Sequence, residues 1–212
     1  MRRHFALALG LAACTPVYPA VNFAHVNVVD TQAKSAAPDF EAVRDRWTRR
    51  VHLNHEWDTA IDGHVVLLSD EMRVALVGKM SDMMKLAEAE RATLVAQQAK
   101  DAAEMWELVF LVDTSRFEWN DFSASKTVWS LTLADDAGHL IGHPEIIIAP
   151  EKPTMIEALY PWTGPFTRTF RVRFPRAIDG KPTLADPPRA LTLRIAGPLG
   201  AVDARWESEP AP

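Results

Sequence analysis

Residues 105–112 have the sequence MWELVFLV, which is apolar or aromatic at every position except Glu107. A short run of apolar and aromatic residues of this kind is typical of a central strand that is covered on both faces. Residues 169–174, TFRVRF, alternate instead and place Phe170, Val172 and Phe174 on one face, with arginines on the other. The two patterns predict a sheet with a buried centre and an inward-facing apolar side.

Further strand patterns follow along the C-terminal half of the chain. They are TVWSLTL (127–133), HLIGHPEIIIA (139–149), ALTLRI (190–195) and AVDARWE (201–207). Pro144 breaks or weakens the second of these, and residues 197–200 connect the last two as a hairpin. Six to eight short strands separated by turn residues predict an antiparallel β-sandwich.

A helical segment is expected at residues 69–104, as an insertion in the strands. Ser69 is a good N-cap, and acidic residues follow it at the positive end of the helix dipole. Apolar residues then recur at intervals of three and four. The segment is either one long helix or two helices bent around residues 86–88, and we favour the pair because one helix of that length would overrun a small domain. The fold class is therefore α+β.

The N-terminus has the layout of a secretory leader. Residues 1–14, MRRHFALALGLAAC, carry two arginines and then an apolar stretch over 5–13. That stretch is too short to cross a bilayer, which needs roughly 20 apolar residues in a helix. The sequence thus predicts export from the cytoplasm.

Residues 11–14, LAAC, resemble the lipobox of bacterial lipoproteins, and the C-terminal half is similar in texture to sandwich domains of uncharacterised envelope lipoproteins. The resemblance implies cleavage before Cys14, acylation of its thiol and attachment to membrane lipid; it implies no activity. Thr15 in place of an aspartate favours the outer membrane over the inner one. Cys14 is the only cysteine, so the chain forms no internal disulfide. The alternatives are a leader cut elsewhere, for instance near Ala20, or no cleavage.

The domain organisation follows from these signals. The 212 residues suit one domain. We expect a signal peptide at 1–13, a lipid anchor and tether at 14–38, a single globular β-rich domain at 39–207 and a disordered tail at 208–212. Residues 21–30, VNFAHVNVVD, could add an edge strand. The net charge of −5 argues against a nucleic-acid partner.

Two aromatic loops are the strongest binding signal. One loop, SRFEWNDFSASK (115–126), contains Phe117, Trp119 and Phe122, and the other, LYPWTGPF (159–166), contains Tyr160, Trp162 and Phe166. The candidate binding residues are Trp119, Phe122, Tyr160 and Trp162. Flat rings on such loops can stack on sugars or anchor a protein partner. The alternative is that these rings fold back and close the ends of the sandwich.

Other candidate groups have simpler explanations. The histidine pairs and the methionine cluster could bind a metal, but the spacing of the histidines does not bring three ligands together, and the methionines continue a helix stripe that suits core packing. The candidate metal ligands are His52 with His55, His139 with His143, and Met80 with Met83 and Met84. A separate candidate group is the basic row Arg168, Arg171 and Arg173. The arginine row reads as a solvated strand face. No cofactor and no metal site is predicted.

No catalytic residue is predicted, because the chain has no G-x-S-x-G elbow and no cysteine beyond Cys14. The leading hypothesis is a non-enzymatic envelope lipoprotein that binds another envelope protein or the cell-wall polymer. A periplasmic metal-handling protein is the second hypothesis, and a hydrolase is the third.

Overall fold

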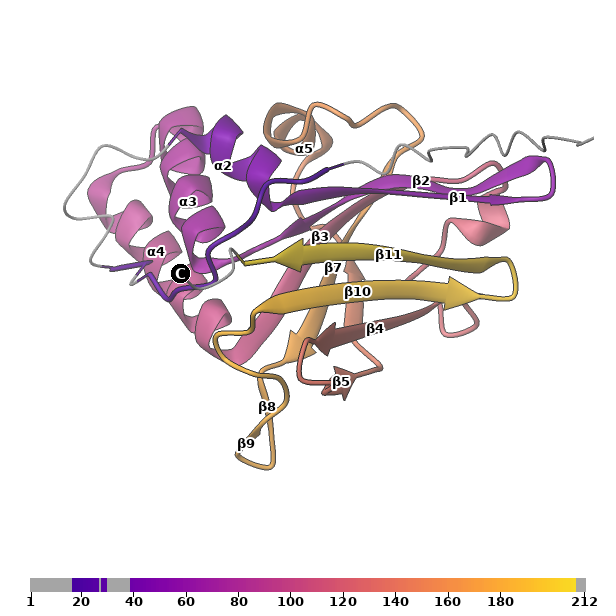
Figure 1. The fold of residues 1–212 in the computed structure, drawn as a ribbon. Coiled ribbons are helices and arrows are strands. Elements are labelled where there is room, and N and C mark those ends of the chain that lie inside the picture. Colours follow the sequence, from indigo (N-terminus) through magenta and orange to yellow (C-terminus); the bar gives the residue numbers. More distant parts are fainter. Residues whose placement is uncertain (1–16, 27, 30–38, 209–212) are drawn as a thin grey trace, which may run out of the picture.

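The computed structural model describes residues 17–26, 28–29 and 39–208, and its body consists of two antiparallel sheets (Figure 1). The leader, Cys14 and residues 209–212 lie outside the described residues. The first sheet has the order β1 (Thr48–His55), β2 (Asp58–Leu67), β3 (Met105–Asp113), β7 (Arg168–Pro175) and β6 (Glu145–Ile148). The second has the order β11 (Gly200–Glu207), β10 (Ala190–Gly197), β4 (Ser130–Asp135) and β5 (Leu140–Ile141). A small ribbon pairs β8 (Ala177–Ile178) with β9 (Lys181–Pro182).

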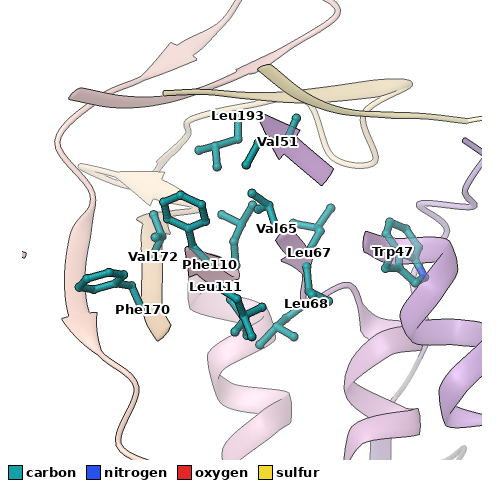
Figure 2. Close-up of a cluster of buried hydrophobic side chains, with 14 of the residues drawn as sticks. Trp47, Val51, Val65, Leu67, Leu68, Phe110, Leu111, Phe170, Val172 and Leu193 are labelled. Carbon is teal, nitrogen blue, oxygen red and sulfur yellow. The ribbon is translucent and has the colours of Figure 1, made fainter. Parts of the chain in front are cut away.

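The central strand predicted from MWELVFLV is confirmed. β3 lies in the middle of the five-stranded sheet, and every residue from 106 to 112 is buried. Figure 2 shows why both faces are covered: Phe110 and Val65 point toward Leu193 of the second sheet, whereas Leu111 and Leu68 point toward the helices. The three inward side chains predicted in β7 are fully buried.

The helical insertion consists of two helices, as favoured from the sequence. α3 (Asp70–Met84) begins at Ser69, whose hydroxyl accepts a hydrogen bond from the Met72 N–H at 3.2 Å. α3 ends where Lys85 adopts a left-handed conformation with φ of 53°. α4 (Glu88–Glu104) then leads directly into β3. The break occurs because the N–H groups of Lys85 and Leu86 both turn back to the Ser81 carbonyl.

The other helices are short and lie against the five-stranded sheet. They are α2 (Phe40–Trp47), α5 (Pro153–Leu159) and the 3₁₀ turn η1 (Phe117–Trp119). In Figure 1, α2, α3 and α4 gather at one end of the sheets, opposite the hairpin between β1 and β2. Within the described residues, no helix is both long enough and apolar enough to cross a membrane.

The segment expected to be a free tether is docked on the domain over its described part. Val21 is buried, donates its N–H to the Glu207 carbonyl at 2.8 Å and forms an isolated parallel bridge with Ser208. Phe23 packs edge-on against Trp47 with ring centroids 5.5 Å apart. Within the expected tether at 14–38, the described residues 17–26 thus lie against the domain because their apolar side chains find partners in the core, and Val21 contributes an isolated bridge where an edge strand was the alternative.

Candidate functional site

The predicted binding rings of the first loop fold into the core. Trp119 and Phe122 are buried. Phe122 stacks on Trp129 at 5.6 Å and meets Phe110 edge-on at 4.9 Å, and the Trp129 indole N–H donates to the Trp119 carbonyl at 2.8 Å. These two rings therefore close the end of the sheets, which was the alternative interpretation of this loop.

The rings of the second loop are also held by the fold. Tyr160 is buried, and burial raises the pKa of its hydroxyl to about 12. Trp162 is partly buried, stacks on His64 with a centroid distance of 4.5 Å and carries the Arg44 guanidinium over its ring at 5.0 Å. Among the four predicted rings, only Trp162 keeps a substantial exposed surface, so the proposed binding role needs other side chains.

Three other rings point outward at one end of the domain. Trp57, Phe117 and Phe166 are 101%, 84% and 84% exposed. Trp57 lies in the two-residue turn between β1 and β2, Phe117 follows β3, and Phe166 precedes β7. Because neighbouring strands of the five-stranded sheet are antiparallel, these connections lie at the same end of the strands. We call these three residues the aromatic end.

The loops of the aromatic end are fastened to one another. Arg116, beside Phe117, binds the Asp58 carboxylate next to Trp57 at 2.5 Å. Thr59 and Ser115 exchange backbone and hydroxyl hydrogen bonds of 2.8–2.9 Å. The Thr167 hydroxyl donates to Asp113 at 2.8 Å. The exposed rings therefore stand on connections whose backbones are held in place, which reduces the entropy lost when a partner binds.

The surroundings of the aromatic end are acidic. Trp57 lies between Glu56 and Asp58, and Phe117 precedes Glu118. The nearby Arg116 is already paired with Asp58. The sequence analysis did not single out Trp57 as a binding residue. The available signal was a tryptophan between two acidic residues in a turn between two strands.

The histidine pairs do not assemble a metal site. His52 and His55 are three residues apart in β1, where odd spacing sends side chains to opposite faces. His52 contacts Asp62 at 3.4 Å, and His139 contacts Asp135 at 2.7 Å. In the part of the chain that the structure describes, no group of three His, Cys, Asp or Glu side chains is arranged to hold a metal ion.

The methionine cluster does not continue into the core as expected. Met80 packs partly against the main core, but Met83 and Met84 are 37% and 50% exposed. The reason is their position in the last turn of α3, after the buried stretch that ends at Gly78.

The arginine row of β7 is not a solvated face. Arg171 binds Glu107 at 3.3 Å and also pairs with Glu151, and Arg173 binds Glu145 and Asp101 at 3.0 and 3.4 Å. This expectation is corrected because helices cover the face that alternation assigned to water.

The ion pairs of this row continue through Glu107 to a buried arginine of α3. Arg73 of α3 is fully buried and binds Glu107 at 2.9 Å, and Glu107 also binds Arg171. Burial lowers the pKa of Arg73, and the neighbouring Glu107 opposes that shift. A chain of alternating charges therefore joins α3, β3 and β7.

A second polar cluster surrounds His25 on the docked N-terminal segment. Its Nδ1 lies 3.2 Å from Asp70 Oδ2, and its Nε2 lies 3.0 Å from Asp186 Oδ1. Arg176 holds the other oxygen of Asp186 at 2.8 Å. These four side chains line a shallow groove of about 530 Å³.

No family model matches the chain, and neither a curated protein nor a solved structure matches it. The class is therefore defined by the fold alone: a mixed α and β domain built on two antiparallel sheets.

Proposed function

We propose that the chain is an extracytoplasmic lipoprotein, acylated on Cys14 and held at the outer membrane, whose sandwich-like domain binds an envelope partner and performs no catalysis. The observation that supports this proposal is the aromatic end, where Trp57, Phe117 and Phe166 are exposed on interlinked loops. The lipobox-like residues 11–14 supply the anchor.

The energetic reason lies in the apolar area of the three rings. Moving one such side chain from water into a protein interface contributes about 1.5–3 kcal/mol. Aromatic residues are also the residues on which binding interfaces most often depend. All three exposed rings stand on connections at the same end of one sheet, which favours their use in one binding surface.

The acidic surroundings favour a partner of a particular charge. Glu56 and Glu118 adjoin the rings in the sequence. The two arginines on these connections, Arg116 and Arg168, lie 2.5 and 3.9 Å from Asp58 and Asp121. A protein surface with apolar pockets and basic side chains complements this arrangement. A cell-wall polymer is the competing partner, since carboxylates and rings also suit sugar hydroxyls and sugar faces.

The anchor is tested by intact mass and membrane fractionation of the wild type and Cys14→Ala in a lipoprotein-competent bacterium. We expect acyl mass and membrane association in the wild type, and a soluble or unprocessed chain in the variant. If both chains are released into the periplasm at one unmodified mass, the anchor does not exist.

The binding surface is tested by a photo-crosslinking amino acid placed at Phe117 in intact cells, with Lys100 on α4 as the matched exposed position. We expect a discrete crosslinked protein from position 117 that disappears on adding Trp57→Ser and Phe166→Ser. Equal products from both positions would contradict the proposal. Retention on purified cell-wall polymer, lost in the same variant, would identify the polymer as the partner instead.

A further inference from the structure

The docked N-terminal segment carries a histidine in an unusual position between two carboxylates. His25 Nδ1 lies 3.2 Å from Asp70 Oδ2, and Nε2 lies 3.0 Å from Asp186 Oδ1. Asp70 is the first residue of α3, and Asp186 lies between β9 and β10. His25 therefore joins the segment to two separate elements of the domain.

The chemistry of imidazole decides which charge state this position requires. A neutral imidazole has one N–H donor and one lone pair, whereas the protonated ring has two donors. Two ionised carboxylates can only accept. A neutral His25 can therefore donate to only one of them, whereas the protonated ring, whose side chain is 56% exposed, donates to both.

We propose that His25, Asp70 and Asp186 form a proton-dependent clasp that holds residues 17–26 on the domain when His25 is protonated and weakens when the ring loses its proton. Histidine is the one side chain of this cluster that can gain or lose its charge without leaving the neutral region of pH, because aspartate and arginine keep theirs. The contacts contribute at acidic pH and are lost as the pH rises.

Each carboxylate of the clasp has a second partner besides His25. Asp70 Oδ2 also accepts the Val26 N–H at 3.2 Å. Asp186 Oδ2 accepts from Arg176 Nη1 at 2.8 Å, and the Arg176 guanidinium lies 3.6 Å from the centre of the Trp106 ring. Asp70, Asp186 and Arg176 are the charged side chains that line the groove with His25 within the described residues. Arg176 compensates the negative charge of Asp186, so the charge of Asp70 remains for His25 to compensate.

The clasp has a consequence for the anchor, and this step rests on the proposed function. Val17, the first described residue, lies three positions after Cys14. Three extended residues span roughly 10 Å, so a docked segment keeps the domain close to the lipid. Release of residues 17–26 would lengthen the chain between Cys14 and the sheets and let the aromatic end reach a more distant partner.

The test is hydrogen exchange at the amides of residues 21–26 in the full chain, between about pH 5.5 and 8.5, expressed as protection relative to the intrinsic rate at each pH. We expect wild-type protection to fall by about tenfold as the pH rises. His25→Gln should remove the pH dependence and leave weak protection throughout.

Asp186→Asn provides the sharper variant. Its amide nitrogen can donate to a neutral His25 while its oxygen still accepts from Arg176, so all groups are satisfied without a charged ring. We expect protection to persist at about pH 8.5 in this variant. Asp203→Asn, on the surface of β11 beside Arg194, is the matched control and should follow the wild type.

Two results would overturn the clasp: wild-type protection that does not change with pH, or Asp186→Asn protection that falls as in the wild type. Intact mass is recorded on the same samples. An unacylated Cys14 would contradict the anchor without altering the exchange result, because all clasp contacts lie within the domain and its docked segment.

Discussion

Single side chains of β7 show how the environment of a charge depends on the whole fold. Alternation in residues 169–174 correctly assigns the apolar side chains to the core, but it assigns Arg171 and Arg173 to water. Both arginines instead pair with carboxylates, and Arg171 is linked through Glu107 to the buried Arg73. Buried charges of this kind are tolerated only when each has a partner.

Removing one member of this network should be costly. Arg73→Met leaves Glu107 with a buried carboxylate oxygen whose partner is gone, and we expect the free energy of unfolding to fall by about 3 kcal/mol. Urea denaturation measures this change. Arg194→Met, which removes the exposed pair with Asp203, is the control and should change stability little. Equal losses in the two variants would mean that the buried network has no special role.

His64 gives a prediction about pH. Burial lowers the pKa of His64 below its ordinary value of 6.5, and the nearby Arg50 adds to the shift. The unfolded chain therefore binds this proton more readily, so stability is present above that value and is lost as the pH falls below it. His64→Gln should make the acid-side loss shallower in urea denaturation series from about pH 7 to 5. His143→Asn, at an exposed turn, should leave the slope unchanged.

At the scale of elements, local signals located the strands and the helix start well. Pro144 separates β5 from β6 as expected, and the GPLG turn joins β10 to β11 in register from Gly197 to Gly200. The length of the helical segment predicted that it divides in two. The position of the division depends on Lys85, which adopts the left-handed conformation although it is not a glycine.

Replacing Lys85 at that division should increase the stability of the protein. The left-handed conformation has a conformational energy about 1–2 kcal/mol higher for a non-glycine residue, whereas glycine adopts it without this cost. We expect Lys85→Gly to raise the free energy of unfolding by about 0.5–1 kcal/mol after the entropy of the unfolded chain is counted. Thermal and urea denaturation check this value. Lys100→Gly, inside α4, is the opposite control and should cost about 1 kcal/mol; destabilisation at both positions would contradict the capping argument.

At the scale of the whole molecule, the two sheets are joined by side chains where β1 and β11 lie side by side. The Trp206 indole N–H donates to the Trp47 carbonyl at 2.8 Å. Arg49 of β1 donates to the Arg205 carbonyl at 2.6 Å and to the Arg46 carbonyl at 2.8 Å. Burial lowers the pKa of Arg49 to about 10, so the side chain remains charged at neutral pH.

Arg49 should therefore be needed for the assembly of the two sheets. Arg49→Met removes the donors for several buried carbonyls, and we expect a loss of about 3 kcal/mol together with a lower midpoint in urea denaturation. Arg50→Met, the next residue on the exposed side of the same strand, is the matched control and should be nearly neutral. If the two variants lose the same stability, the contact between the sheets does not depend on Arg49.

The aromatic loops show the limit of prediction for the candidate site. The sequence pointed to the two loops, and both contribute an exposed ring, but it singled out Trp119, Phe122 and Tyr160, which are buried, and it missed Trp57. Composition marks a loop as aromatic, whereas the direction of each ring depends on which core residues lie beneath it.

Local sequence patterns were enough to predict the strands of the C-terminal half, the helix start at Ser69 and the buried centre at MWELVFLV, because the period of apolar residues is a local property of the chain. Long-range packing, in contrast, surrounds Arg171 with carboxylates, docks residues 17–26 on the domain and brings His25 to two aspartates. Each of these depends on elements far apart in the chain, and one sequence carries no direct signal of which distant groups come together.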